Sequence, residues 1–190
     1  MDLGIDKRER ILAAASRLIV QNGLQCSMSA IAEEAGVATG SLYNYFDSKE
    51  ALVRGVYGRV AEEMTARLST PPDPALGHEE RIRQYIADYL AFIWEDALRA
   101  RLFDYLDNTP FITLSDAQAI FGNFVDHAIT MIAEAQAAGV VRQGTPTMLA
   151  SHIRGAIRNS MKRRRMRPEP ITTDEMDLIA DMCWQALAAR

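Results

Sequence analysis

Apolar side chains recur at helical spacing, at positions i, i+3, i+4 and i+7, along almost the whole chain. Strict alternation of apolar and polar residues, which marks a half-buried strand, is nearly absent. The first stripe predicts a helix over about residues 5–21 that ends at Asn22-Gly23, a dipeptide suited to a left-handed helix stop. The apolar members of this stripe are Ile11, Leu12, Ala15, Leu18 and Ile19. The pattern therefore predicts an all-α fold.

Two short helices are expected next. Ser27 is a suitable N-cap for a helix that ends at Gly36. The inward-facing residues of this helix would be Ile31, Ala32 and Ala35. The following segment TGSLYNYF, residues 39–46, is too short to be stable alone as a helix. We expect Leu42 and Phe46 to hold it against the first two helices, which leaves its other side free to meet a partner.

Longer helices follow, separated by proline-containing breaks. Asp47, with Glu50 three residues later, resembles a capping box and predicts a fourth helix through about Leu68. The segment STPPDPALG, residues 69–77, holds three of the seven prolines and predicts a loop. Further helices are expected at about 78–106, 113–138, 146–165 and 173–189, and the first of these is long enough to be two helices. We expect two domains, residues 1–52 and 53–190.

Composition excludes several classes of protein. Of the 190 residues, 48% are hydrophobic and 24% are charged, as in an ordinary globular protein. The longest apolar stretches are shorter than the ~20 residues that cross a bilayer, and MDLGIDKRER lacks the apolar part of a secretory signal. We therefore expect a cytoplasmic protein with no membrane partner. Cys26 and Cys183 lack CxxC spacing, and the histidines (His78, His127 and His152) are scattered, so we expect buried thiols and no metal, cofactor or enzymatic site.

The formal net charge of −4 at first argues against a nucleic-acid partner, because phosphates require local positive charge. Residues 1–60, however, contain seven Lys/Arg and seven Asp/Glu, so the negative surplus lies in the remainder of the chain. A neutral N-terminal segment suits a protein that contacts DNA through a few placed donors rather than through a generally basic surface.

A helix, a tight glycine turn and a short second helix form the arrangement that places one helix in the major groove of DNA. Gly36 would make the turn, and the outer face of the following helix is polar. That face consists of Thr39, Gly40, Ser41, Tyr43 and Asn44, with Lys49 placed for a phosphate. Hydroxyl groups can donate to phosphates or base edges, and Asn44 can pair with an adenine edge. The alternative is a helical hairpin in which Tyr43, Tyr45 and Phe46 belong to a core.

The segments RILAAASRLIVQNG and SAIAEEAGVATGSLYNYFDSKEALV resemble the TetR family, the tetracycline-repressor-like regulators, over residues 8–56. In that family GVxxGxLYxYFxxKExL is a specific signature. The resemblance implies a homodimer whose short third helices enter successive major grooves of a double-stranded operator, an all-α C-terminal domain that encloses a small-molecule effector, and release of DNA when the effector binds. The DNA-contacting positions it implies are Ser27, Ser29, Thr39, Gly40, Ser41, Tyr43, Asn44, Tyr45 and Lys49. Two positions depart from the family pattern, because Ala38 and Asn44 stand where a hydroxyl cap and a histidine are frequent.

Beyond residue 56 the resemblance is one of topology. Aromatic residues and methionines gather in the middle helices, where an apolar wall with a few polar groups would suit a small, flat or amphipathic ligand. The candidate pocket residues are Tyr85, Tyr89, Phe92, Phe103, Phe111, Phe121, Phe124, His127 and Met131. Helical spacing alone also fits ordinary core residues, so that alternative stays open for each of them.

The last two predicted helices are candidates for the dimer interface, the position that they occupy in the resembled family. The candidate interface residues are Ile157, Met176, Ile179, Met182, Cys183, Trp184, Ala186 and Leu187. The same stripe could instead pack within the subunit. The basic run KRRRMR, residues 162–167, falls at a predicted helix end, where cations are favoured by the helix dipole. Three alternatives are open for this run: it is a solvated helix end, it lies at the rim of a subunit interface and pairs with acidic residues of the other subunit, or it is a second contact with a polyanion.

The sequence thus favours a ligand-responsive repressor that binds a pseudo-palindromic operator. A ligand-independent DNA-binding or architectural protein, with the same N-terminal domain and a filled C-terminal core, is the alternative. A cavity among the central aromatic residues would distinguish the two.

Overall fold

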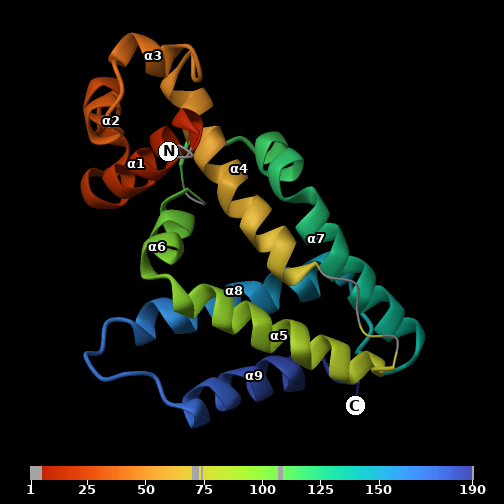
Figure 1. Ribbon diagram of the computed structural model, residues 1–190. Helices are drawn as coiled ribbons and strands as arrows, with labels where there is room; N and C mark the ends of the chain where they lie inside the picture. The colour runs from red at the N-terminus through yellow and green to blue at the C-terminus, as the bar shows by residue number, and fades with distance from the viewer. Residues whose placement is uncertain (1–5, 70–72, 74, 107–108, 190) are drawn as a thin grey trace. The chain divides into compact units, whose positions relative to one another are not determined.

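The computed structural model describes residues 6–69, 73, 75–106 and 109–189. Over these residues every regular element is helical, and the one β contact is an isolated bridge between Val141 and Ala188. The elements are α1 (Lys7–Asn22), the 3₁₀ turn η1 (Gly23–Gln25), α2 (Met28–Glu34), α3 (Thr39–Tyr43), α4 (Lys49–Leu68), α5 (His78–Glu95), α6 (Ala97–Leu106), α7 (Leu114–Ala137), α8 (Pro146–Arg164) and α9 (Thr173–Leu187) (Figure 1). The predicted all-α class is confirmed. Part of the predicted 69–77 loop lies outside the described residues.

The chain packs as two compact units. The first consists of Met1–Glu63 with Ala97–Phe121, and the second of Met64–Asp96 with Gly122–Arg190. Helices α4 and α7 each contribute residues to both units. Asp96, which joins α5 to α6, has φ −122° and ψ 103° and therefore ends α5. The predicted stretch 78–106 is thus two helices, and their junction is where the chain passes from the second unit to the first.

Side-chain caps set several helix starts in the first unit. Ser27 Oγ accepts a hydrogen bond from Ala30 N at 3.1 Å and begins α2, as the sequence predicts. Helix α4 begins differently, because Ser48 Oγ accepts from Ala51 N at 3.1 Å. The cap is therefore Ser48, and the predicted capping box of Asp47 and Glu50 is wrong. A serine directly before the first helical residue reaches the N3 amide, and that contact displaces the start of α4 by one residue.

The core of the first unit is built by helices that each bury one face. Helix α1 packs against α2 and α6, and α2 packs against α3. The side chains that these helices and α4 bury most completely include Ile11, Leu12, Ile19, Ile31, Leu42, Leu52, Val53 and Val56. An aromatic cluster adds to this core, because Tyr57 on α4 meets Phe121 edge-on at 5.1 Å and stacks on Phe103 at 6.4 Å between ring centroids.

In the second unit α5 packs against both α8 and α9, and these two helices also pack against each other (Figure 1). Arg83 on α5 ties α5 to α9, because its guanidinium lies 5.0 Å from the ring centroid of Trp184 and 3.4 Å from Asp181. Helix α9 begins with a complete capping box, in which Thr172 and Glu175 exchange side-chain and backbone hydrogen bonds. These contacts fix α9 on the rest of its unit.

Candidate nucleic-acid interface

The turn between α2 and α3 is a tight, glycine-dependent helix end. Gly36 has φ +64°, a left-handed value that other residues rarely adopt. Val37 N donates to Ala32 O at 2.9 Å and Gly36 N donates to Glu33 O at 3.0 Å. These two bonds form a Schellman motif, which reverses the chain after α2 and satisfies two of its last carbonyls. The turn that the sequence predicts at Gly36 is confirmed.

Helix α3 buries one side and exposes the other. Leu42 is fully buried, and Phe46, just after the helix, is also buried. Tyr43 and Tyr45 are 49% and 42% exposed, and Thr39, Gly40 and Asn44 are exposed as well. Ser41 is half-buried. The polar face predicted for this segment is therefore accessible, and neither tyrosine belongs to the core.

Gly40 lies on this exposed face without any packing reason for a glycine. A Cβ added there would meet no atom of the described residues within 4 Å. Its backbone is helical, so conformation does not require glycine either. What remains is the space outside the subunit, where a missing side chain lets another molecule approach the backbone of α3 closely.

The remaining residues of the predicted interface flank α3. Ser27 and Ser29 are exposed at the start of α2, and their hydroxyl oxygens lie 2.9 Å apart. Lys49 is the half-buried first residue of α4. The cationic groups nearby are partly engaged, because the Arg8 guanidinium lies 5.6 Å from the Phe46 ring centroid and Arg17 pairs with Glu34 at 2.9 Å. The predicted DNA-contacting residues thus belong to α2, α3 and the start of α4 in one unit.

A cavity of about 360 Å³ lies in the second unit, between the N-terminal part of α5 and the C-terminal half of α7. Its walls combine apolar and charged groups. They are formed by Leu68, Asp73, Leu76, His78, Arg81, Gln84, Tyr85, Asp88, His127, Thr130, Met131 and Glu134. Three of the predicted pocket residues, Tyr85, His127 and Met131, are among them. Burial raises the pKa of Tyr85, and the charge of Arg154 partly opposes that shift.

The structure separates the other predicted pocket residues from this cavity. Tyr89 and Phe124 are buried behind Tyr85, with ring centroids 6.2 and 6.3 Å from it, and Phe92 is buried further along α5. Phe103 and Phe121 belong to the first unit, in the cluster around Tyr57. Phe111 is half-buried in the turn before α7, where its amide donates to Thr109 Oγ1 at 3.3 Å.

Sequence reasoning missed most of the polar cavity wall. The missed residues include His78, Arg81 and Asp88 on α5, and Thr130 and Glu134 on α7 beside the predicted His127. Both sets keep the helical spacing of one face. A search for polar residues at helical spacing, alongside the aromatic ones, could have found them.

The surface of α9 is partly apolar. Leu178 and Met182, one turn apart, are 60% and 54% exposed. Of the predicted interface residues, Met176, Ile179 and Ala186 are half-buried. The others pack within their own unit: Ile157, Cys183, Trp184 and Leu187. For those four residues the structure agrees with the alternative that the stripe packs within the subunit. The dimer interface itself stays a prediction.

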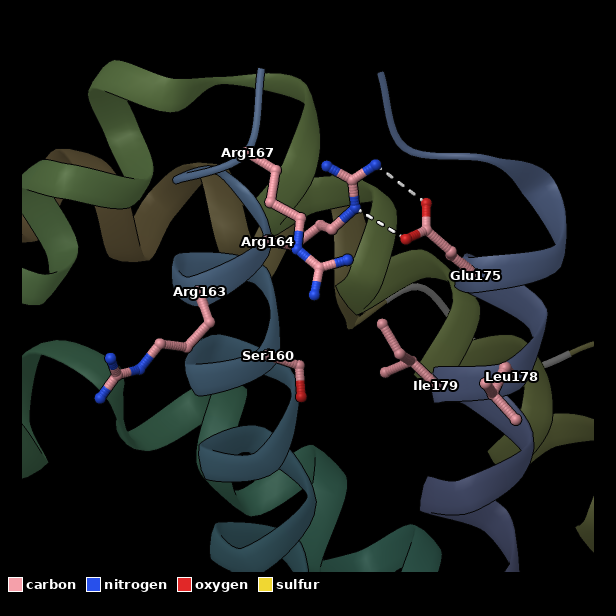
Figure 2. A pocket seen from close by; sticks show the side chains of 7 residues that line it. All are labelled: Ser160, Arg163, Arg164, Arg167, Glu175, Leu178 and Ile179. Atoms are coloured by element: carbon pink, nitrogen blue, oxygen red, sulfur yellow. Dashed lines mark hydrogen bonds and ion pairs between the residues drawn. The ribbon is translucent and has the colours of Figure 1, made fainter. Parts of the chain in front are cut away.

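The basic run at the end of α8 is divided between inward and outward contacts. Figure 2 shows Arg164 reaching Glu175 on α9, whereas Arg163 points away from that pair. Arg164 Nε and Nη2 lie 2.9 and 3.0 Å from the Glu175 carboxylate, and the guanidinium also donates to the carbonyls of Glu169 and Pro170. The Arg165 guanidinium lies 5.1 Å from the Trp94 ring centroid. Two of these arginines thus have structural partners within the subunit.

The same region contains a smaller hollow of about 270 Å³. It is lined by Ser160, Arg163, Arg164, Arg167, Glu175, Leu178 and Ile179 (Figure 2). The Arg164 guanidinium beside Glu175 lowers the pKa of that carboxyl to about 2. The hollow therefore borders a fixed ion pair between α8 and α9.

In the described part of the chain, no group of three or more His, Cys, Asp or Glu side chains is placed to hold a metal ion. Cys26 and Cys183 are both buried, as predicted, and burial raises the pKa of the Cys183 thiol to about 11. No helix in the described ranges combines the length and the hydropathy that a membrane span needs.

Comparison with known proteins agrees with this geometry. Residues 11–56 match the family model described as bacterial regulatory proteins, tetR family. An uncharacterized HTH-type transcriptional regulator of Haemophilus influenzae is 35% identical over 92 residues, which cover 48% of this chain and 49% of the relative. The chain thus spans about half the length of the curated relatives it matches.

Solved structures extend the likeness of the fold to nearly the whole chain. A tetR family transcription regulator from Shewanella sp. PV-4 has a TM-score of 0.89 and 23% identity, with 98% of this chain and all of that chain covered. AibR in complex with isovaleryl coenzyme A and operator DNA has a TM-score of 0.75 and 20% identity, with 96% and 98% covered. At these identities the likeness concerns the fold.

Proposed function

We propose that the chain, whose residues 11–56 match the model of the tetR family of bacterial regulatory proteins, is a cytoplasmic homodimeric transcription repressor of that family. Each protomer presents α3 to one half of a pseudo-palindromic operator. A small-molecule effector, bound in the second unit, releases the protein from DNA.

The exposed polar face of α3 is the observation that carries this proposal. A five-residue helix cannot persist on its own, and burying Leu42 contributes about 1.5–3 kcal/mol to holding it in place. The exposed face includes two tyrosines, whose rings and hydroxyls can contact sugars and phosphates together. A short helix that is packed against the core on one face and is polar and exposed on the other is suited to entering the major groove.

The cavity in the second unit supports an effector-responsive function. Its mixture of apolar walls and charged groups is typical of sites that bind and orient a small amphipathic molecule. AibR, which is similar in fold, has been crystallised with isovaleryl coenzyme A and operator DNA. The cavity includes Tyr85 but none of the other central aromatic residues, so it supports an effector site at its polar wall rather than the predicted cavity among the aromatic residues.

Effector action requires that the ligand bind the DNA-incompetent conformation more tightly than the DNA-competent one. The cavity is lined by the end of α4 and by α7, and both helices continue into the first unit. The α5–α6 junction at Asp96 is a third covalent connection between the units. These three segments are the routes by which binding in the second unit can affect the first.

Selection from a randomised DNA duplex library tests the proposal. The purified protein should enrich a two-fold symmetric sequence whose half-sites are about one helical turn, roughly 34 Å, apart, because a dimer presents one α3 to each half-site. Failure to enrich any sequence, or enrichment of a single asymmetric half-site, would contradict the proposal.

Substitutions in the interface give a prediction with distinct outcomes. Lys49→Ala should weaken binding to every duplex and reduce the slope of log affinity against log salt concentration by about one, because one phosphate contact is lost. Tyr43→Ala should weaken binding to every duplex without changing that slope, since the phenol is uncharged. Asn44→Ala, on the same face, should instead alter the bases selected. Gel-shift titrations that show unchanged affinity for Lys49→Ala and Tyr43→Ala would refute these assignments.

A further inference from the structure

Arg10, near the start of α1, reaches across the first unit to the end of α2. Its Nη2 donates to Ala35 O at 2.6 Å and to Gly36 O at 3.0 Å. These acceptors lie 25 and 26 residues further along the chain, at the C-cap of α2 and at the residue after it. A single guanidinium thus binds two consecutive carbonyls of the turn between α2 and α3.

The backbone hydrogen bonds of the turn do not use these two carbonyls. The Schellman motif uses the carbonyls of Ala32 and Glu33. Arg10 satisfies two acceptors further along the chain, the carbonyls of Ala35 and Gly36. The C-terminus of a helix carries partial negative charge, so a cation there is favoured, and hydrogen bonds from a charged donor are stronger than those between neutral groups.

Gly36 and Arg10 fit each other. A Cβ added at Gly36 would lie 2.7 Å from Arg10 Nη2, closer than a real contact permits. The glycine therefore permits the positive φ of the turn and also the close approach of the guanidinium.

Helix α3 depends on this turn for its orientation. It begins at Thr39, three residues after Gly36, and its N-cap is Ala38, which has no side-chain acceptor. The other contacts that hold α3 are the burial of Leu42, the burial of Phe46 just after the helix, and packing against α2.

We propose that Arg10 is a positioning residue for DNA recognition: by holding the carbonyls of Ala35 and Gly36 it ties the turn to α1 and sets the angle at which α3 is presented. This inference rests on the proposed function. It assigns to Arg10 an action through α3 rather than a contact with phosphate.

Arg17 provides a matched control. It also lies on α1 and also bridges to α2, through an ion pair with Glu34 at 2.9 Å. Truncation of either arginine leaves its acceptor on or just after α2 without that partner. Of the two, only Arg10 binds backbone carbonyls of the turn, whereas Arg17 binds the side chain of Glu34. The ion pair of Arg17 is solvent-exposed, and such pairs contribute little to stability.

The experiment uses the duplex selected by the wild-type protein and a scrambled duplex of equal length. Arg10→Ala should lower affinity for the selected duplex at least about tenfold relative to Arg17→Ala, because a misdirected α3 loses hydrogen bonds to bases. Affinity for the scrambled duplex and the salt slope should change little, and titration should show an unchanged binding-competent fraction. Arg10→Lys should not restore affinity, because a lysine is a point donor on a shorter side chain.

Four results would overturn the inference. The first is equal affinity of Arg10→Ala and Arg17→Ala for the selected duplex. The second is a fall of about one in the slope of log affinity against log salt concentration for Arg10→Ala, together with recovery of that slope in Arg10→Lys. These two results would indicate a phosphate contact. The third is a reduced competent fraction with unchanged affinity, which indicates a folding defect alone. The fourth applies if Arg10→Ala does not fold. In that case the affinity of Arg10→Lys for the selected duplex tests the inference, and an affinity equal to wild type would overturn it. Failure of the wild-type protein to select any duplex would instead refute the proposed function.

Discussion

Gly36 and Gly40 are four residues apart, but different surroundings account for each glycine. At Gly36 the positive φ disfavours any side chain, and a Cβ would also require the Arg10 guanidinium to move. At Gly40 the helix would accept a Cβ without contact inside the subunit. If α3 lies in a DNA groove, the constraint at Gly40 comes from the DNA backbone. Substitution of Gly36 would then affect folding, whereas substitution of Gly40 would affect DNA binding.

Gly40→Ala is therefore expected to retain the thermal stability of the protein while weakening its binding to the selected duplex. Alanine is favoured over glycine in helices by about 1 kcal/mol in interior positions, so no loss of stability is expected from the backbone. The added methyl group would meet DNA at the closest approach of α3. Thermal melts and gel shifts on the same preparations check both parts.

Gly58→Ala is the matched control, because Gly58 lies on α4 and a Cβ there also meets no described atom within 4 Å. It should melt at or above the wild-type temperature and bind DNA with wild-type affinity. Equal DNA binding by the Gly40 and Gly58 variants would remove the evidence that α3 approaches DNA through Gly40.

At the scale of elements, an ion pair within a helix cap joins α8 to α9. Glu175 closes the capping box of α9 with Thr172 and also accepts from Arg164 of α8. One carboxylate thus stabilises the start of one helix and joins it to the end of another.

This junction predicts a pH dependence of stability. Arg164 lowers the pKa of Glu175 from 4.5 to about 2, so the folded state favours the ionised carboxylate. Its contribution is complete above the unfolded value and is lost as the pH falls through about 2. Glu175→Gln should therefore lower the melting temperature at neutral pH, and the difference from wild type should shrink below pH about 4.5.

Asp177→Asn, on the exposed surface of the same helix, is the comparison for this measurement. Its difference in melting temperature from wild type should stay nearly constant over the same pH range. A constant difference for Glu175→Gln as well would show that the ion pair does not contribute to folding stability.

At the scale of the whole molecule, the exposed apolar residues of α9 bear on assembly. Leu178 and Met182 lie one turn apart on the helix, next to half-buried Ile179. Exposure of such an apolar stripe to water is unfavourable in free energy, and association of two copies through it would remove that exposure. The proposed dimer also supplies the second α3 that a symmetric operator needs.

Met182→Glu should therefore convert the proposed dimer into a monomer of 21.2 kDa and lower affinity for the selected duplex, because a monomer binds only one half-site. Multi-angle light scattering measures the mass. Leu114→Glu, at an exposed apolar residue of the first unit, should keep the wild-type mass. A wild-type mass of one chain at working concentrations would contradict the proposed dimer.

The sequence by itself determined several local features of this protein, although it placed the cap of α4 at Asp47 rather than at Ser48. The start of α2 at Ser27, the turn at Gly36 and the polar face of α3 were all predicted from residues within a few positions of each other. Capping, turn formation and amphipathic spacing are short-range effects, so the identity of neighbouring residues is sufficient to predict them.

Only the tertiary structure decided which helices face each other. It assigned Phe103 and Phe121 to the first unit and Tyr85 to the cavity of the second, although all three have the same apolar spacing. It also brought Arg10 to the carbonyls of the turn, across 25 residues. Helical periodicity defines the buried face of each helix but not its neighbour, because that choice depends on the packing of distant segments against each other.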